Sequence, residues 1–156
     1  MKKVSNFLYK TLFLIIFTFS ANAENKILTL GAMDSKITVK VFSSLTCPHC
    51  ANFHKNIFEK LKKDYINDGN VRFEHHSFPL DLAALNAEII IRCHEDNNKR
   101  FQLLGEIYKK QSQWAVGSDI NKINESLKEI GLNFGLKNNT MDKCLKNEKE
   151  QDQILN

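Results

Sequence analysis

The sequence is poor in several features that would point to particular classes of protein. Only two of its 156 residues are proline and six are glycine. It contains no internal repeat, low-complexity tract or linker-like stretch. Residues 11–19 form an apolar run of nine, well below the roughly 20 residues that a membrane-spanning helix needs. A chain of this length is sufficient for one domain.

The first 23 residues have the pattern of a secretory signal peptide. A basic segment precedes the short apolar run, and Ala21-Asn22-Ala23 follows as a small-residue cleavage site. The basic residues of this segment are Lys2, Lys3 and Lys10. We expect cleavage after Ala23, which would leave Glu24 as the N-terminus of an exported protein. An uncleaved anchor helix is the alternative.

The positive charge of the sequence is concentrated in that segment. The segment contains three lysines and no acidic residue, so its removal lowers the net charge from +4 to +1. A nearly neutral mature chain gives no electrostatic evidence for nucleic-acid binding.

Residues 36–75 have the pattern of a strand, a helix and a second strand. Apolar and polar residues alternate over 36–43 and again over 71–75, as in half-buried strands. Between them, apolar residues recur at intervals of four and predict a helix that ends at 68–70. The predicted inward stripe is Phe53, Ile57, Leu61 and Tyr65, with Phe58 beside it. Such a unit predicts two parallel strands joined by a right-handed crossover.

The remainder of the chain reads as four helices whose starts are marked by capping residues. Their apolar stripes are interpreted as core faces, and none resembles a cofactor-binding sequence. The predicted starts are Asp81, Asn97 or Asn98, Ser118 for a helix closed by Gly131, and Asn139 or Thr140.

Four cysteines follow the signal peptide, and two of them are three residues apart. Cys47 comes after the first predicted strand and at the start of the helix, where free backbone N–H groups and the helix dipole stabilise a thiolate. Cys50 lies on the same helix face. Pro48 suits the first turn because it has no N–H to leave unpaired. His49 can add a positive charge or a donor near the thiolate.

This arrangement predicts a redox-active dithiol in which Cys47 attacks and is attacked, and Cys50 resolves the mixed disulfide. Two alternatives stay open: a structural disulfide within the pair, or half of a zinc site completed by Cys93 and His94. A haem-attachment site would need His after Cys50, where the sequence has Ala51.

The segment Ser44-Leu45-Thr46-Cys47-Pro48-His49-Cys50 resembles the DsbA-like thioredoxin-fold oxidoreductases of the bacterial periplasm. The resemblance covers roughly residues 27–155. It continues through Phe78-Pro79-Leu80-Asp81, Arg92-Cys93, Gln113-Trp114 and Asp142-Lys143-Cys144-Leu145. It implies an α/β thioredoxin-like fold, with a βαβ part over 24–80 and an inserted helical domain over 81–156. It also implies a periplasmic location and oxidation of substrate thiols through Cys47 and Cys50.

The sequence departs from the family pattern in two places. Family members have a cis-proline loop facing the dithiol, followed by two more strands and a helix. Neither Pro48 nor Pro79 fits that loop, so we expect a sheet that is incomplete at its C-terminal side and a truncated chain. The family often has a buried acid six residues before the first cysteine. Val41 stands there, so a proton relay through a buried carboxylate is not expected.

The remaining candidate residues are expected to be structural. Cys93 and Cys144 lie in two predicted helices, and export favours a structural disulfide between them over two free buried thiols. His54 is expected to be exposed, and His75 and His76 to be ordinary residues at the end of a strand. Trp114 is expected in a loop, packing rather than binding.

The leading hypothesis is a periplasmic enzyme that forms disulfides in reduced secreted proteins and is reoxidised by a membrane or soluble redox partner. It would need no cofactor, metal or nucleic acid. A disulfide reductase or isomerase is a related alternative. A truncated, non-catalytic fragment or binding module, with the dithiol present but unable to dock a substrate, is an alternative of another class.

Overall fold

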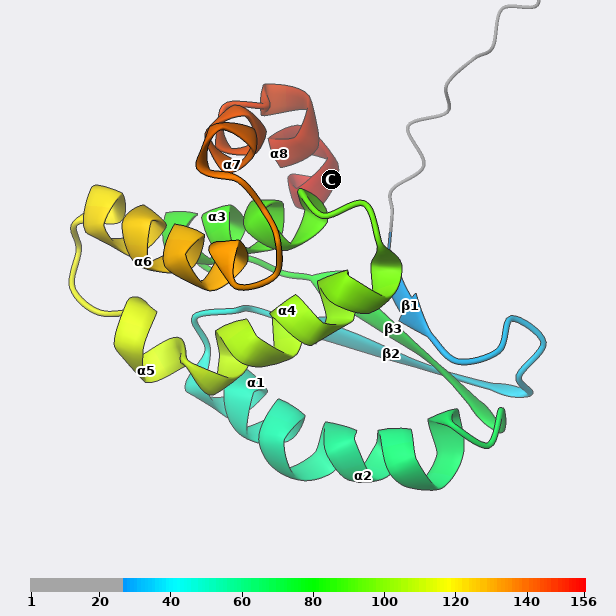
Figure 1. The fold of residues 1–156 in the computed structure, drawn as a ribbon. Coiled ribbons are helices and arrows are strands. Elements are labelled where there is room, and N and C mark those ends of the chain that lie inside the picture. The colour runs from blue at the N-terminus through cyan, green and yellow to red at the C-terminus, as the bar shows by residue number, and fades with distance from the viewer. Residues whose placement is uncertain (1–26) are drawn as a thin grey trace, which may run out of the picture.

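The computed structural model describes residues 27–156. The predicted signal peptide and its cleavage site lie outside the described residues. The described part is a small sheet covered by helices, coloured along the chain in Figure 1. None of the helices in this part is long and apolar enough to cross a membrane.

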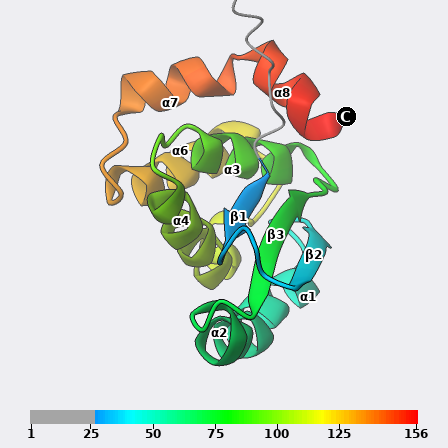
Figure 2. The ribbon, with the colours of Figure 1, turned by 90° about the vertical axis from the view of Figure 1, so that its right-hand side faces the viewer.

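Three strands form the sheet: β1 (Leu28–Leu30), β2 (Ile37–Ser43) and β3 (Val71–Ser77), in the order β1-β3-β2. β2 and β3 are parallel, as the strand–helix–strand pattern predicted, with Val41 opposite His75. β1 pairs antiparallel with β3, so the sheet has one strand more than expected. Figure 2 shows β3 between its two neighbours. Three residues are too few for β1 to show alternation in the sequence.

The predicted helix between β2 and β3 is present as α1 (Pro48–Phe53), η1 (His54–Phe58), α2 (Glu59–Leu61) and η2 (Lys62–Ile66). The predicted inward stripe is partly wrong. Phe53 and Leu61 pack against the core and Phe58 is buried. Ile57 and Tyr65 are exposed, and Ile66 is buried instead. Two π-helical turns widen the helix. In a helix widened in this way, residues four apart stay on one face. Contacts with the rest of the fold bury the face that contains His54, Phe58 and Ile66.

The helices that follow are capped mainly by acidic residues. Asp81 caps α3 (Leu82–Arg92), as predicted, and accepts a hydrogen bond from the Ala84 N–H at 2.7 Å. Asp96 and Asp119 cap α4 (Asn97–Lys109) and α6 (Ile120–Leu132), each within two residues of the predicted cap. The other helices are α5 (Gln111–Trp114), α7 (Asn138–Leu145) and α8 (Glu148–Leu155), of which α5 and α8 were not predicted.

The hydrophobic core lies between β3 and the helices of the C-terminal half. Phe73 at the centre of β3 is fully buried, together with Ile90 of α3 and Leu104 of α4. Trp114 is buried in α5 rather than placed in a loop, and its indole N–H donates to the Ile107 carbonyl at 2.8 Å. Its predicted packing role is confirmed.

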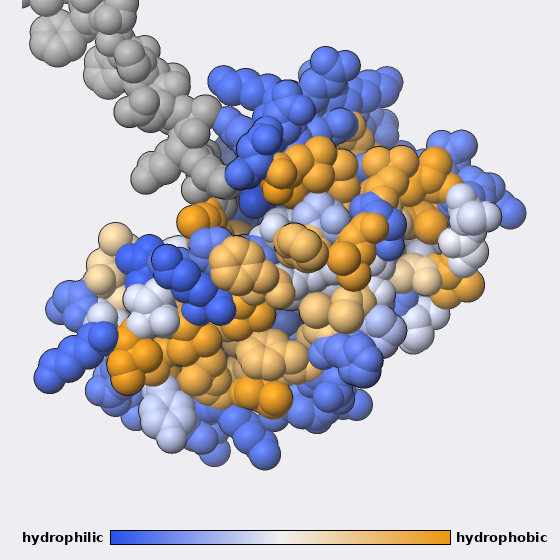
Figure 3. Space-filling view, turned by 180° about the vertical axis from the view of Figure 1, so that it is seen from behind, coloured by the Kyte–Doolittle hydropathy of each residue, from blue (hydrophilic) through white to orange (hydrophobic). Residues whose placement is uncertain are grey.

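The β2 side of the sheet is less covered. Among residues 27–156, no strand pairs with the outer edge of β2. Ile37 and Phe42 of β2 are more than half exposed, as are Phe78 and Leu80 just beyond β3. Apolar side chains gather on the face turned away from the viewer in Figure 1, which Figure 3 shows.

Candidate functional site

The two cysteines of the predicted dithiol lie at the start of α1. Cys47 is the N-cap with extended backbone, Pro48 follows at the first helical position, and the Ala51 N–H closes the first turn on the Cys47 carbonyl at 3.1 Å. Both cysteines are partly exposed free thiols. No side-chain hydrogen bond caps this helix start, so the first backbone N–H groups are available to the Cys47 sulfur.

The helix start separates the acidities of the two thiols. The backbone N–H of Cys50, the Cys50 thiol and the backbone N–H of His49 lower the pKa of Cys47, against a smaller opposing effect of burial. Burial raises the pKa of Cys50, and the neighbouring Cys47 sulfur adds to this. The helix start therefore favours the thiolate form at Cys47 more than at Cys50. His49 contributes to the lower pKa of Cys47 through its backbone N–H, and the expected role of its ring stays a prediction.

Side chains from the helical half hold the loop that carries Cys47. The Gln111 amide of α5 donates to the Leu45 carbonyl at 2.7 Å and to the Cys47 carbonyl at 3.0 Å. The Thr46 hydroxyl donates to the Asp81 carboxylate at 2.7 Å. The dithiol loop is thus fixed from α5 on one side and from the cap of α3 on the other.

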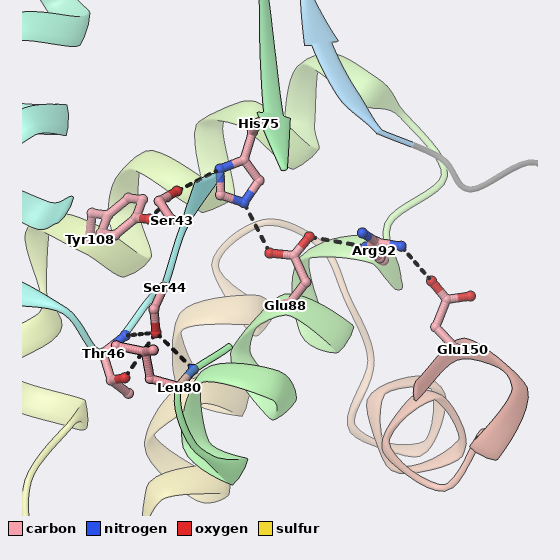
Figure 4. A network of polar contacts seen from close by, with 9 residues as sticks. All are labelled: Ser43, Ser44, Thr46, His75, Leu80, Glu88, Arg92, Tyr108 and Glu150. Atoms are coloured by element: carbon pink, nitrogen blue, oxygen red, sulfur yellow. Dashed lines mark hydrogen bonds and ion pairs between the residues drawn. The ribbon is translucent and has the colours of Figure 1, made fainter. Parts of the chain in front are cut away.

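A chain of buried polar side chains runs through the fold behind this loop, as Figure 4 shows. The Tyr108 hydroxyl donates to Ser43 Oγ at 3.1 Å, and Ser43 Oγ lies 3.2 Å from His75 Nδ1. His75 Nε2 lies 3.1 Å from a carboxylate oxygen of Glu88, whose other oxygen accepts from Arg92 Nε at 3.0 Å.

This chain corrects one prediction. His75 was expected to be an ordinary strand residue, yet it is 1% exposed and pairs with a fully buried carboxylate. That carboxylate belongs to Glu88 of α3. Burial alone would raise the pKa of Glu88, but the charge and hydrogen bond of His75 and the Arg92 guanidinium outweigh it and lower that pKa. His76 lies outside this chain, with its Nε2 3.0 Å from the Glu74 carboxylate.

His54 was expected to be exposed, and this prediction is wrong as well. Its ring is 5% exposed and stacks on Tyr108 at 4.4 Å between centroids. Burial, helped by the charge of His75, lowers the pKa of His54 to about 3, so this imidazole is neutral at pH 7. The sequence signal for this placement was only its position four residues before Phe58.

The other two cysteines form a disulfide. Cys93 at the end of α3 is bonded to Cys144 of α7, with Cα atoms 5.9 Å apart. Since the Cys93 sulfur is already bonded, it is unavailable to a zinc site with Cys47 and Cys50. No cluster of three metal-ligating side chains occurs among residues 27–156.

A thioredoxin family model matches residues 23–156, nearly all of the chain. This chain belongs to the thioredoxin family. Its relatives place it among the DsbA-like members. A Rickettsia bellii protein named "Putative protein-disulfide oxidoreductase" is 35% identical over 128 residues, which cover 82% of this chain and 48% of that protein. "Disulfide bond formation protein D" of Bacillus subtilis is 29% identical over 136 residues, covering 81% of this chain and 60% of that protein.

The fold agrees with that placement. The crystal structure of alpha-DsbA1 from Wolbachia pipientis matches 83% of this chain and 64% of its own, with a TM-score of 0.76 and 28% identity. The expected thioredoxin-like fold and the DsbA-like resemblance are thereby confirmed. This DsbA-like chain spans about half the length of the Rickettsia relatives it matches.

Proposed function

We propose that this chain is a periplasmic thiol:disulfide oxidoreductase that forms disulfides in reduced secreted proteins. The observation that carries the proposal is the position of two free, partly exposed thiols at the start of α1, where backbone N–H groups lower the pKa of Cys47 while burial raises the pKa of Cys50. A redox pair at a helix start needs this difference, because one sulfur must leave readily and the other must wait as the resolving thiol.

The reaction starts from the Cys47–Cys50 disulfide. A substrate thiolate attacks the Cys47 sulfur, the Cys47–Cys50 bond breaks, and Cys50 leaves and takes up a proton. A second substrate thiolate then attacks the substrate sulfur of the mixed disulfide, and Cys47 leaves as a thiolate. The substrate has lost two electrons to form its disulfide, and the dithiol has gained them. Stabilising the Cys47 thiolate favours this direction over reduction.

The location and the partners rest on further observations. The signal-peptide pattern of residues 1–23 and the Cys93–Cys144 disulfide both suit an oxidising compartment. A redox partner must reoxidise the dithiol after each cycle. Exposed apolar side chains flank the dithiol loop: the Phe78 N–H donates to the Ser43 carbonyl and the Leu80 N–H to Ser44 Oγ. They offer contacts for an unfolded substrate chain.

The test combines thiol reactivity with turnover. Alkylation of the reduced chain over a pH series should show Cys47 reacting fast at pH values well below 8, with the Cys50→Ser variant retaining that reactivity. Oxidation of a dithiol peptide should require both cysteines. When Cys50→Ser is offered a peptide that contains a disulfide, Cys47 should attack it and the mixed disulfide should accumulate, because the resolving thiol is missing.

Equilibration with glutathione then fixes the direction. A Cys47–Cys50 disulfide that is reduced more readily than glutathione disulfide supports the oxidase. A disulfide that is harder to reduce supports the reductase or isomerase. Fast alkylation without any peptide oxidation would instead support the non-catalytic binding module. Ordinary reactivity at Cys47 in the folded chain would contradict the redox assignment itself.

A further inference from the structure

A groove of about 1020 Å³ lies between the helix that carries the dithiol and α4. It is lined from one side by residues of α1, η1 and α2, and from the other by residues of α4. Its volume is of the size that small-molecule sites occupy. The apolar part of its wall comes from Leu30, Phe58, Phe101 and Tyr108, which also belong to the hydrophobic core.

Gly105 lies in the middle of α4 and lines the groove. A Cβ built on it would meet nothing within 4 Å, so the groove has room for a side chain at this position.

His54 also lines the groove. Its ring is buried and stacks on Tyr108, so the two rings form one continuous part of the wall.

The rim of the groove carries an excess of positive charge. Its charged residues are Lys55, Lys62, Lys109, Glu59 and Glu106. Lys109 lies 3.6 Å from the Glu106 carboxylate, but Lys55 and Lys62 form no ion pair within residues 27–156. The two free lysines lie seven positions apart, on one face of the dithiol helix.

We propose that this groove binds a small amphipathic carboxylate, with its apolar body against Phe58 and Phe101 and its acidic group at Lys55 and Lys62. The site is separate from the dithiol, and its occupant would touch the His54–Tyr108 stack that leads to Ser43. The proposal does not depend on the redox activity of the chain.

Two probes of equal tail length and opposite charge test this. The purified chain, labelled with ¹⁵N, is titrated with decanoate and separately with decyltrimethylammonium, and amide chemical shifts are followed. Saturable shifts at residues 51–62 and 98–109, with decanoate binding more tightly, are expected. Equal affinity for the two probes, or shifts confined to the β2 face around Phe42 and Phe78, would overturn the proposal.

Variants at one position give a matched control. Gly105→Ala adds a methyl group to the helix and should keep decanoate binding, whereas Gly105→Trp fills the groove and should abolish it. Lys55→Gln with Lys62→Gln should weaken decanoate about threefold, whereas decyltrimethylammonium should bind no more weakly than before because the same change removes repulsion. Circular dichroism and the alkylation rate of Cys47 report whether Gly105→Trp is folded. Decanoate binding that survives in a folded Gly105→Trp chain would refute the site.

Discussion

The amide of Gln111 donates at 3.0 Å to the carbonyl of Cys47, 64 residues earlier in the sequence. The same amide nitrogen donates to the Leu45 carbonyl, so the first residue of α5 holds both ends of the segment that leads into the dithiol helix. Through these two hydrogen bonds the helical half of the chain fixes the backbone at Cys47.

Replacing Gln111 with Leu should loosen the dithiol loop. Two hydrogen bonds are lost from partly buried carbonyls, so the free energy of unfolding should fall by about 1–3 kcal/mol. The alkylation rate of Cys47 at pH 6 should fall too, because the backbone N–H groups that stabilise its thiolate are less well fixed. Gln113 is exposed and its side chain makes no hydrogen bond within the described residues, so Gln113→Leu is the control. Equal rates in the two variants would contradict a positioning role for Gln111.

The buried Glu88 carboxylate should make stability depend on acid pH. Its pKa is lowered in the fold, so its contribution is present above the pKa of the unfolded chain, about 4.3, and is lost as the pH falls through the lower folded value. Glu88→Gln should lower the free energy of unfolding by about 3–5 kcal/mol at pH 7, because it removes the charged partner of the buried His75 and leaves Arg92 paired only with Glu150. The loss should shrink below pH 4.

Urea denaturation at pH 7 and at pH 3.5 measures this. Glu129 is exposed and forms no ion pair in the described part of the chain, and Glu129→Gln should change stability little at either pH. A Glu88→Gln chain as stable as the parent at pH 7 would show that the pair contributes no net stability.

The neutral, buried His54 should make stability depend on pH in a higher range than Glu88 does. Its folded pKa of about 3 lies below the value of the unfolded chain, about 6.5. Between these values the unfolded state binds the extra proton, so stability should fall as the pH is lowered, by up to about 1.4 kcal/mol per pH unit. His54→Phe keeps an aromatic ring on Tyr108 and should remove this slope between pH 6 and pH 4.5. Glu88→Gln should retain it there, and an unchanged slope in His54→Phe would show that another group causes it.

The Cys93–Cys144 disulfide should stabilise the fold without acting on the dithiol. The bond closes a loop of 51 residues, for which loop-closure entropy gives about 4 kcal/mol. The double variant Cys93→Ala with Cys144→Ala should lose stability of this order in urea denaturation. Its Cys47 alkylation profile should match that of the parent chain. A shifted profile would mean that α3 and α7 position the dithiol as well as support the fold.

Most of the reactive centre could be predicted from the sequence, because its chemistry is local. A strand that ends at Ser43, a Pro at the first helical position and two cysteines three residues apart define the thiolate site within one turn of helix. The Asp81 cap and the parallel pairing of β2 with β3 are equally short-range or follow from a general rule of chain handedness.

The tertiary structure alone decided which polar residues are buried around that site. Glu88 and His75 are 13 residues apart on a helix and a strand, and nothing in either segment marks them as partners. The buried face of the dithiol helix includes His54 because Tyr108 of α4 packs there. Helix caps and the backbone hydrogen bonds within a helix join residues that are close in sequence. The burial of a charge or an imidazole depends on a partner that only folding brings within reach.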